Sequence, residues 1–246
     1  MPSGVPAQRQ VGEAWQNYSG SPTIRPLMEK HFASRPVRDL YDGDVKQEIH
    51  SKLITSSAKK VLSPFGLFQK GRSRTWLSDQ NWWMVVVEFQ PSSSSRGSYL
   101  NVGCMWLWNV KPYISFDVGY RVEEFCPFRN EEDFAIVAEN LATQALQKTT
   151  HYRRLFATIG QVSDYYVSHA PDSFWPCFDA AVSHILAGQP GLATQLLAEC
   201  VHESDDDPLW LTEGRSRAKE LLTALNEPDR VRDIITKHVH ETRKTA

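Results

Sequence analysis

The chain has 246 residues, of which 41% are hydrophobic and 23% are charged, close to the averages of soluble globular proteins. This composition excludes a collagen-like, a wholly disordered and a disulfide-scaffold protein. With 27 Lys and Arg against 29 Asp and Glu, the net charge is -2, so the chain as a whole has no electrostatic bias toward nucleic acid or anionic membranes.

The cysteines and the apolar segments bear on the compartment. Cys104, Cys126, Cys177 and Cys200 show no CxxC spacing, which favours a reduced, cytoplasmic protein. The N-terminal segment lacks a basic stretch followed by an apolar run, and no stretch of about 18 apolar residues occurs. We therefore expect neither a secretory signal nor a membrane span.

The first part of the chain divides into a tail and a helix. Residues 1–26 are rich in Pro, Ser, Gly and Gln without a sustained apolar period, which predicts a disordered tail. From residue 44 apolar residues recur at helical spacing and stop before Ser63-Pro64. This pattern predicts a first helix over 44–62.

The next block changes to a period of two and to strand-forming residues. Segments rich in Val and aromatic residues, separated by turns that contain Ser, Gly, Asn or Pro, predict strands at 65–77, 82–90, 98–108 and 113–121. Short connections between consecutive strands favour an antiparallel meander.

After Pro127 the apolar period returns to 3.6 residues. Asn130 stands three residues before Asp133 and is expected to cap a helix. Gly188, Pro190 and the pair Asp207-Pro208 mark further helix ends. Together with the apolar stripes, these signals predict helices at 152–168, 173–187, 191–203, 208–225 and 228–242.

The predicted fold class is α+β. We expect a four-stranded or slightly larger antiparallel meander sheet with helices on one face, followed by a C-terminal all-helical region. The α+β domain is predicted over 27–168 and the C-terminal helical hairpin region over 169–246.

Strand alternation places charged and aromatic side chains on one side of the predicted sheet. If the strands pair in order, a partner protein could contact an open face that carries Lys70, Arg72, Arg74, Trp82, Glu88 and Arg121. A second hypothesis is a polar ligand site between sheet and helices, formed by Glu88, Asn101, Asp117 and Arg121. A third interpretation is an ordinary solvated sheet face with cross-strand charge pairs.

Two local charge runs stand out from the neutral background. From Lys59 to Arg74 there are five basic residues and no acid, and from Glu199 to Glu213 there are six acids and no Lys or Arg. The two runs could meet each other, face separate partners or be solvated loops. Basic and aromatic residues are too sparse to favour nucleic-acid binding.

The common catalytic motifs are absent from the sequence. It contains no GxxxxGK[ST], no GxGxxG after a strand, no HExxH and no GxSxG. Four Cys and eight His supply many chance pairs, so we assign none of them as nucleophile or metal ligand. We expect no catalytic residue, no metal and no cofactor, and we favour a protein that is not an enzyme.

Three separated segments resemble one known family. SPFGLFQKGR at 63–72, VVVEFQ at 85–90 and YLNVG at 99–103 are similar in order to the strands of the DUF4304 family, whose members begin with a helix. One departure is that Gly66-Leu67-Phe68 replaces the usual Gly-Phe. The resemblance covers about residues 44–150 and implies an α+β domain of a bacterial protein of unknown function, with no catalytic residue to carry over.

The sequence as a whole predicts a cytoplasmic, non-enzymatic protein-binding module, with an immunity-like role suggested by fold analogy alone. The alternative is a protein or enzyme that binds a small polar ligand between sheet and helices. A further alternative gives the C-terminal helices a docking or dimerisation role. We expect a protein partner, and neither a membrane nor a nucleic acid.

Overall fold

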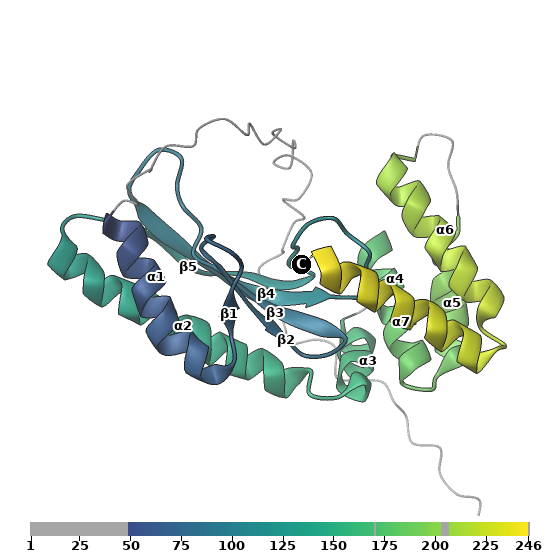
Figure 1. Cartoon of the computed structure of the whole chain (residues 1–246). Helices are drawn as coiled ribbons and strands as arrows, with labels where there is room; N and C mark the ends of the chain where they lie inside the picture. The colour runs from purple at the N-terminus through teal and green to yellow at the C-terminus, as the bar shows by residue number, and fades with distance from the viewer. Residues whose placement is uncertain (1–48, 170, 203–206, 246) are drawn as a thin grey trace, which may run out of the picture. The chain divides into compact units, whose positions relative to one another are not determined.

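Five antiparallel strands form one sheet, and each strand pairs with its neighbour in the sequence. The computed structural model describes residues 49–169, 171–202 and 207–245. The strands are β1 (Phe68–Gln69), β2 (Thr75–Asp79), β3 (Trp83–Glu88), β4 (Gly97–Trp106) and β5 (Val118–Pro127), in the order β1-β2-β3-β4-β5 (Figure 1). The predicted meander is therefore confirmed. The expected tail at 1–26, the start of the first helix and part of the acidic run lie outside the described residues.

The prediction of a single first strand over 65–77 is wrong. A short 3₁₀ turn, η2 (Ser63–Phe65), precedes a hairpin whose turn spans 70–74 and separates β1 from β2. Gly71 has a φ of 54°, a left-handed conformation that glycine adopts without strain. The amide of Lys70 donates to the carbonyl of Thr75 at 2.9 Å and closes the turn. Three basic residues expected on a strand face thus lie in or beside a turn.

The bounds predicted for the fourth strand, 113–121, are wrong, because the observed strand begins at Val118 and ends at Pro127. The structure has a loop at 109–117, and β5 continues to Pro127. Pro112 lacks an amide proton for a ladder hydrogen bond. Asp117 turns its carboxylate inward, where it accepts a hydrogen bond from the amide of Trp106 at 2.8 Å.

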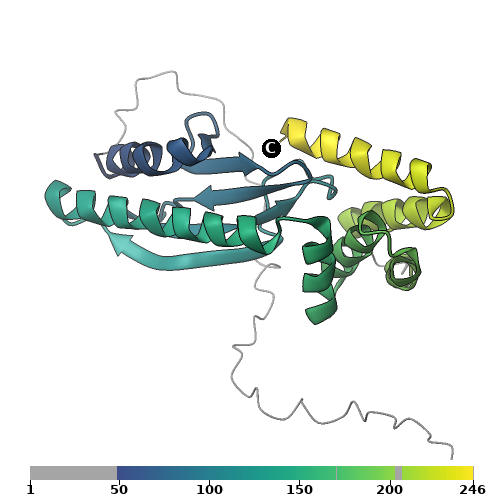
Figure 2. The same ribbon diagram turned by 90° about the horizontal axis from the view of Figure 1, so that it is seen from below.

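Two helices cover one face of the sheet. Helix α1 (Ile49–Leu62) lies beside the long helix α2 (Glu131–Leu155), and both run along the strands in Figures 1 and 2. The predicted cap is confirmed, because the Asn130 side chain accepts a hydrogen bond from the amide of Asp133 at 2.9 Å. Arg153 of α2 donates to Ser78 of β2 and fixes this packing.

The remaining helices gather beyond one end of the sheet in both views (Figures 1 and 2). They are α3 (Ile159–Ser168), α4 (Phe174–Leu186), α5 (Pro190–Cys200), α6 (Leu209–Ala224) and α7 (Pro228–Thr245). The helix expected over 152–168 is instead the end of α2 and then α3, because a capping box between Thr158 and Gln161 starts a new helix. Pro208 is the N-cap of α6 rather than its first residue, and Asp207 pairs with Arg215 at 2.6 Å.

The face of the sheet that points away from α2 is not an open polar surface. Leu77, Val86 and Met105 are buried on that side, as Val85 and Val87 are on the other. Strands that carry apolar residues at both parities are typical of a sheet buried on both faces. Of the polar residues predicted on this face, Glu88 ends β3, whereas Asn101 and Arg121 lie within β4 and β5.

The C-terminal helices attach to the sheet at the end of β4. The indole of Trp106 donates to the Tyr166 hydroxyl of α3 at 2.8 Å, and that of Trp108 donates to the Asp179 carboxylate of α4 at the same distance. Helix α7 reaches the same region, because Thr242 donates to the carbonyl of Asn109 at 3.3 Å. Residues on both sides of the predicted boundary near 168 belong to one compact unit, Lys46–Ala246.

Two glycines lie opposite each other on β4 and β5, and neighbouring atoms leave no space for a side chain at either position. Gly103 pairs with Gly119. A methyl group at Gly103 would collide with the carbonyl of Val118 and the ring of Phe116. A methyl group at Gly119 would collide with the hydroxyl of Tyr152, and its φ of 80° also disfavours other residues.

We predict that Gly103→Ala lowers the free energy of unfolding by about 2 kcal/mol or more, because the added methyl group meets backbone that cannot move aside. Urea denaturation followed by circular dichroism measures the change. Gly191→Ala is the control, since nothing lies within 4 Å of the added methyl group there and α5 gains helix propensity. Equal stability of the two variants would contradict the prediction.

Candidate functional site

A polar row crosses the sheet at the level where β3 ends. The strand register places Glu88 of β3 opposite Asn101 of β4, and Asn101 opposite Arg121 of β5. The Asn101 amide donates to the Glu88 carboxylate at 2.8 Å and to Gln90 Oε1 at 3.0 Å. Gln90 Oε1 also accepts from the Arg121 guanidinium at 3.0 Å. Three of the four residues expected to bind a polar ligand are therefore connected.

Aromatic rings hold the guanidinium of Arg121 in place. It lies 4.1 Å from the ring centroid of Tyr99 and 5.4 Å from that of Tyr120. Both contacts are within the range of cation–π attraction, which favours a guanidinium over an ammonium group. The Arg121 side chain is 26% exposed, so part of it faces solvent while the rings of Tyr99 and Tyr120 fix its direction.

A groove of about 420 Å³ adjoins this row on the side of β2. It is lined by Ser51, Arg72, Ser73, Arg74, Thr75, Glu88, Phe89 and Pro91. We call this depression the arginine groove. Arg74 donates to the carbonyl of Gly97 at 3.1 Å, and burial lowers the pKa of Arg74 while the charge of Glu88 acts in the opposite direction. Arg72 is exposed in the turn before β2 and has no ion-pair partner in the described part of the chain.

Several buried polar atoms at this site have no hydrogen-bond partner among the described residues. They include Nε of Arg74, Nε of Arg121 and Oδ1 of Asn101, whose residue has no exposed surface. An unpaired buried polar atom is costly, so such atoms call for an explanation. The site retains hydrogen-bonding capacity that the described residues do not use.

Three predicted site residues lie elsewhere. Trp82 precedes β3, whereas Glu88 ends it, so about 20 Å of strand separates them. Trp82 stacks on Trp108 with ring centroids 5.5 Å apart and belongs to the tryptophan cluster beside the helices. Lys70 points to the end of α7, where its amine lies 3.4 Å from the carbonyl of Thr245. Both residues are therefore removed from the surface predicted from strand alternation.

Asp117 is the third displaced residue, and it belongs to a buried charge cluster. Its carboxylate pairs with Lys111 at 2.5 Å, and both side chains are less than 10% exposed. Nearby, Asp179 accepts hydrogen bonds from the indole of Trp108 and from the amide of Asn109 at 2.7 Å. Burial, aided by the charge of Asp117, raises the pKa of Asp179 to about 8 against the pull of Lys111.

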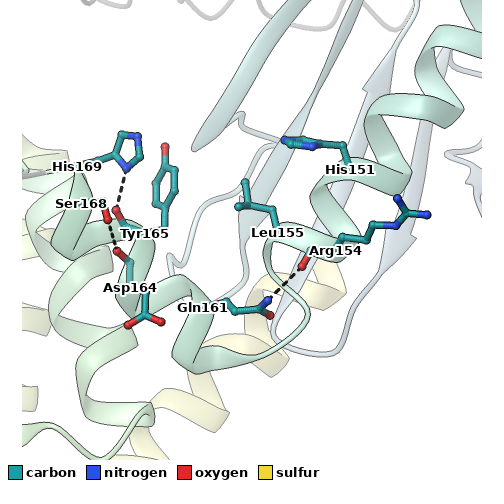
Figure 3. Close-up of a pocket in the computed structure, with 8 residues that line it drawn as sticks. All are labelled: His151, Arg154, Leu155, Gln161, Asp164, Tyr165, Ser168 and His169. Atoms are coloured by element: carbon teal, nitrogen blue, oxygen red, sulfur yellow. Dashed lines mark hydrogen bonds between the residues drawn. The ribbon is translucent and has the colours of Figure 1, made fainter. Parts of the chain in front are cut away.

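A second depression lies between the end of α2 and α3 (Figure 3). Its volume is about 540 Å³, and its lining includes His151, Arg154, Asp164 and His169. The ring of His169 stacks on Tyr165 at 4.3 Å, and its Nδ1 lies 2.9 Å from the Tyr165 carbonyl. Sequence reasoning identified none of these residues, because they lie on two helices whose crossing no local pattern specifies.

A contact between Ser163 and His184 was also not predicted from the sequence. Ser163 Oγ lies 2.7 Å from Nδ1 of His184 and donates to Gln189 Oε1 at 3.0 Å. Both Ser163 and His184 are buried, at 1% and 3% exposure. The contact ties α3 to α4 and satisfies buried polar atoms.

Comparisons with known proteins returned no relative. No family model, no curated protein and no solved structure matches this chain. The resemblance to the DUF4304 family therefore stays a prediction. Across residues 49–169, 171–202 and 207–245, no group of three or more His, Cys, Asp or Glu could hold a metal ion, and no helix there is long and apolar enough to cross a bilayer.

We predict that Asp179→Asn changes how stability depends on pH. The raised pKa means that the folded state keeps a proton which the unfolded state, with a pKa near 3.8, releases. The wild type therefore loses stability as the pH rises from about 4 to about 8, by up to about 1.4 kcal/mol per pH unit. Asn keeps an acceptor oxygen for Trp108 and has no charge. The free energy of unfolding of the variant therefore rises relative to that of the wild type as the pH increases from about 4 to about 8.

Urea denaturation between pH 4 and 9 measures this difference in the free energy of unfolding. Asp164→Asn is the control, because it makes the same substitution on the exposed face of α3. A constant difference for Asp179→Asn from pH 4 to 8 would show that the buried carboxylate is ionised throughout.

Proposed function

We propose that this protein is a non-enzymatic protein-binding module, located in the cytoplasm, that binds an acidic segment of a partner protein in the arginine groove. The groove and the neighbouring row contain four of the six residues expected to contact a partner: Arg72, Arg74, Glu88 and Arg121. The observation that carries the proposal is the exposed guanidinium of Arg72, beside buried polar atoms, none of which has a partner in the part of the chain that the structure describes.

The chemistry of the groove favours a carboxylate as the group it binds. A guanidinium presents donors in a planar fork that matches a carboxylate, and Arg72 forms no ion pair with another described residue. Glu88 also lines the groove, and its negative charge acts on Arg74. An acidic side chain entering the groove would consequently meet Arg72 first.

The proposal of a small-ligand site loses support from the position of Asp117. That carboxylate pairs with Lys111 in the buried cluster, near the opposite end of β4 from Asn101. Glu88 then supplies the negative charge next to Asn101, while Arg121 also pairs with Glu124 at 3.9 Å. Acid–base chemistry with two carboxylates of different pKa requires both of them at one site.

We predict that Arg72→Glu abolishes partner capture and leaves the fold intact. Affinity capture of the tagged full-length protein from lysate of its own cells should recover one protein in near-stoichiometric amount. Charge reversal at the rim of an interface repels an acidic partner, and we expect recovery to fall at least about tenfold, equivalent to about 1.4 kcal/mol.

Arg232→Glu is the matched control, because it reverses an exposed arginine on α7 that is remote in sequence and structure from the groove. Thermal unfolding should give similar midpoints for both variants and the wild type. Equal recovery by Arg72→Glu and Arg232→Glu would refute the groove as the binding surface. A wild-type bait that recovers no protein would refute the binding-module proposal itself.

A further inference from the structure

Two of the four cysteines face each other in a helical hairpin. Cys177 lies on α4 eleven residues before Gly188, and Cys200 ends α5 twelve residues after it. Gly188 has a φ of 76° and reverses the chain between the two helices. Because each helical residue advances the chain by about 1.5 Å, the two cysteines stand at nearly the same height on antiparallel helices.

The contacts of the sulfur atoms agree with this placement. The Cys177 thiol donates to the carbonyl of Leu196 at 3.4 Å, and Leu196 lies one helical turn before Cys200. The thiol of Cys200 donates in turn to the sulfur of Cys177, which lowers the pKa of Cys177 and raises that of Cys200. Both residues are reduced and nearly buried, at 7% and 3% exposure.

The other two cysteines have no thiol neighbour. Cys104 pairs with Val118 and Cys126 pairs with Ser98, which puts about six residues of β4, or about 20 Å, between the two sulfur-bearing positions. A disulfide requires Cα atoms within about 7 Å, so these two residues cannot join. Burial also raises the pKa of both thiols, which makes them poor nucleophiles.

We propose that Cys177 and Cys200 are an oxidisable dithiol that closes to a disulfide between α4 and α5 when the protein meets a peroxide. The dithiol lies on elements that contribute nothing to the arginine groove, so the inference stands apart from the proposed function. The bond joins the two helices of one hairpin and leaves the sheet untouched.

The reaction divides into two steps that balance. The sulfur of Cys177, as thiolate, attacks one oxygen of hydrogen peroxide, the O–O bond breaks, and the departing hydroxide takes up a proton to leave as water. Cys177 is then a sulfenic acid. The sulfur of Cys200 attacks it, the S–O bond breaks, and the hydroxyl leaves with the proton of Cys200 as a second water. Two thiols lose two electrons, and one peroxide is reduced to two waters.

Native oxidation followed by mass spectrometry tests the proposal. The reduced full-length protein is treated with hydrogen peroxide, unfolded, alkylated with iodoacetamide and digested with trypsin. No Lys or Arg lies between residues 155 and 214, so both cysteines stay in one peptide, 155–215. We expect that peptide to be lighter by two hydrogen atoms and unalkylated, while Cys104 and Cys126 are alkylated.

Two variants separate the steps. In Cys200→Ser the sulfenic acid at Cys177 has no resolving thiol, so dimedone should trap it there, whereas Cys177→Ser should leave Cys200 reduced. Cys104→Ser is the control and should oxidise as the wild type does. Full alkylation of all four cysteines after peroxide treatment, or oxidation of Cys177 to sulfinic acid without a disulfide in the wild type, would overturn the proposal.

Discussion

The carboxylate of Asp179 determines how the C-terminal helices join the sheet. It is fully enclosed, and it is held by the indole of Trp108 and the amide of Asn109, two residues that follow β4 directly. An enclosed carboxylate is tolerated only where donors replace water, so α4 can dock in few orientations. The carbonyl of Asn109 also receives Thr242 of α7. The attachments of α4 and α7 to the sheet therefore both depend on Trp108 and Asn109, the short segment that follows β4.

This constraint gives the two ends of the sheet different properties. At the helical end, tryptophan rings stack closely, with Trp106 and Trp108 centroids 5.2 Å apart, and the ion pair of Lys111 with Asp117 is enclosed. At the far end the row of Glu88, Asn101 and Arg121 meets the arginine groove. Charge that would be costly in the packed interior is thus available for recognition at the arginine groove.

The proposed binding surface and the proposed dithiol use different parts of the architecture. The groove is built on strand ends and a hairpin turn, where the cross-strand register fixes each side chain to its neighbours. The dithiol depends on the nearly equal separation of Cys177 and Cys200 from the turn at Gly188, eleven residues before it and twelve after it. Neither feature needs a metal or a cofactor, and each can be altered by one substitution without disturbing the other.

Local sequence signals determined the elements, because caps and turns act over a few residues. Asn130, Gly188 and Pro190 mark helix ends where expected, and alternating strands with short connections gave the meander. Gly71 lies in the turn that separates β1 from β2. A glycine is a turn signal, but the strand-forming residues on both sides of it favoured a continuous strand. Only the tertiary structure decided which side chains meet. A one-residue shift of register turns every side chain to the other face, and register depends on pairing between distant segments. Register therefore decided that a row forms from Glu88, Asn101 and Arg121. Contacts between distant segments likewise decided that Asp117 pairs with Lys111 and that Cys177 lies beside Cys200.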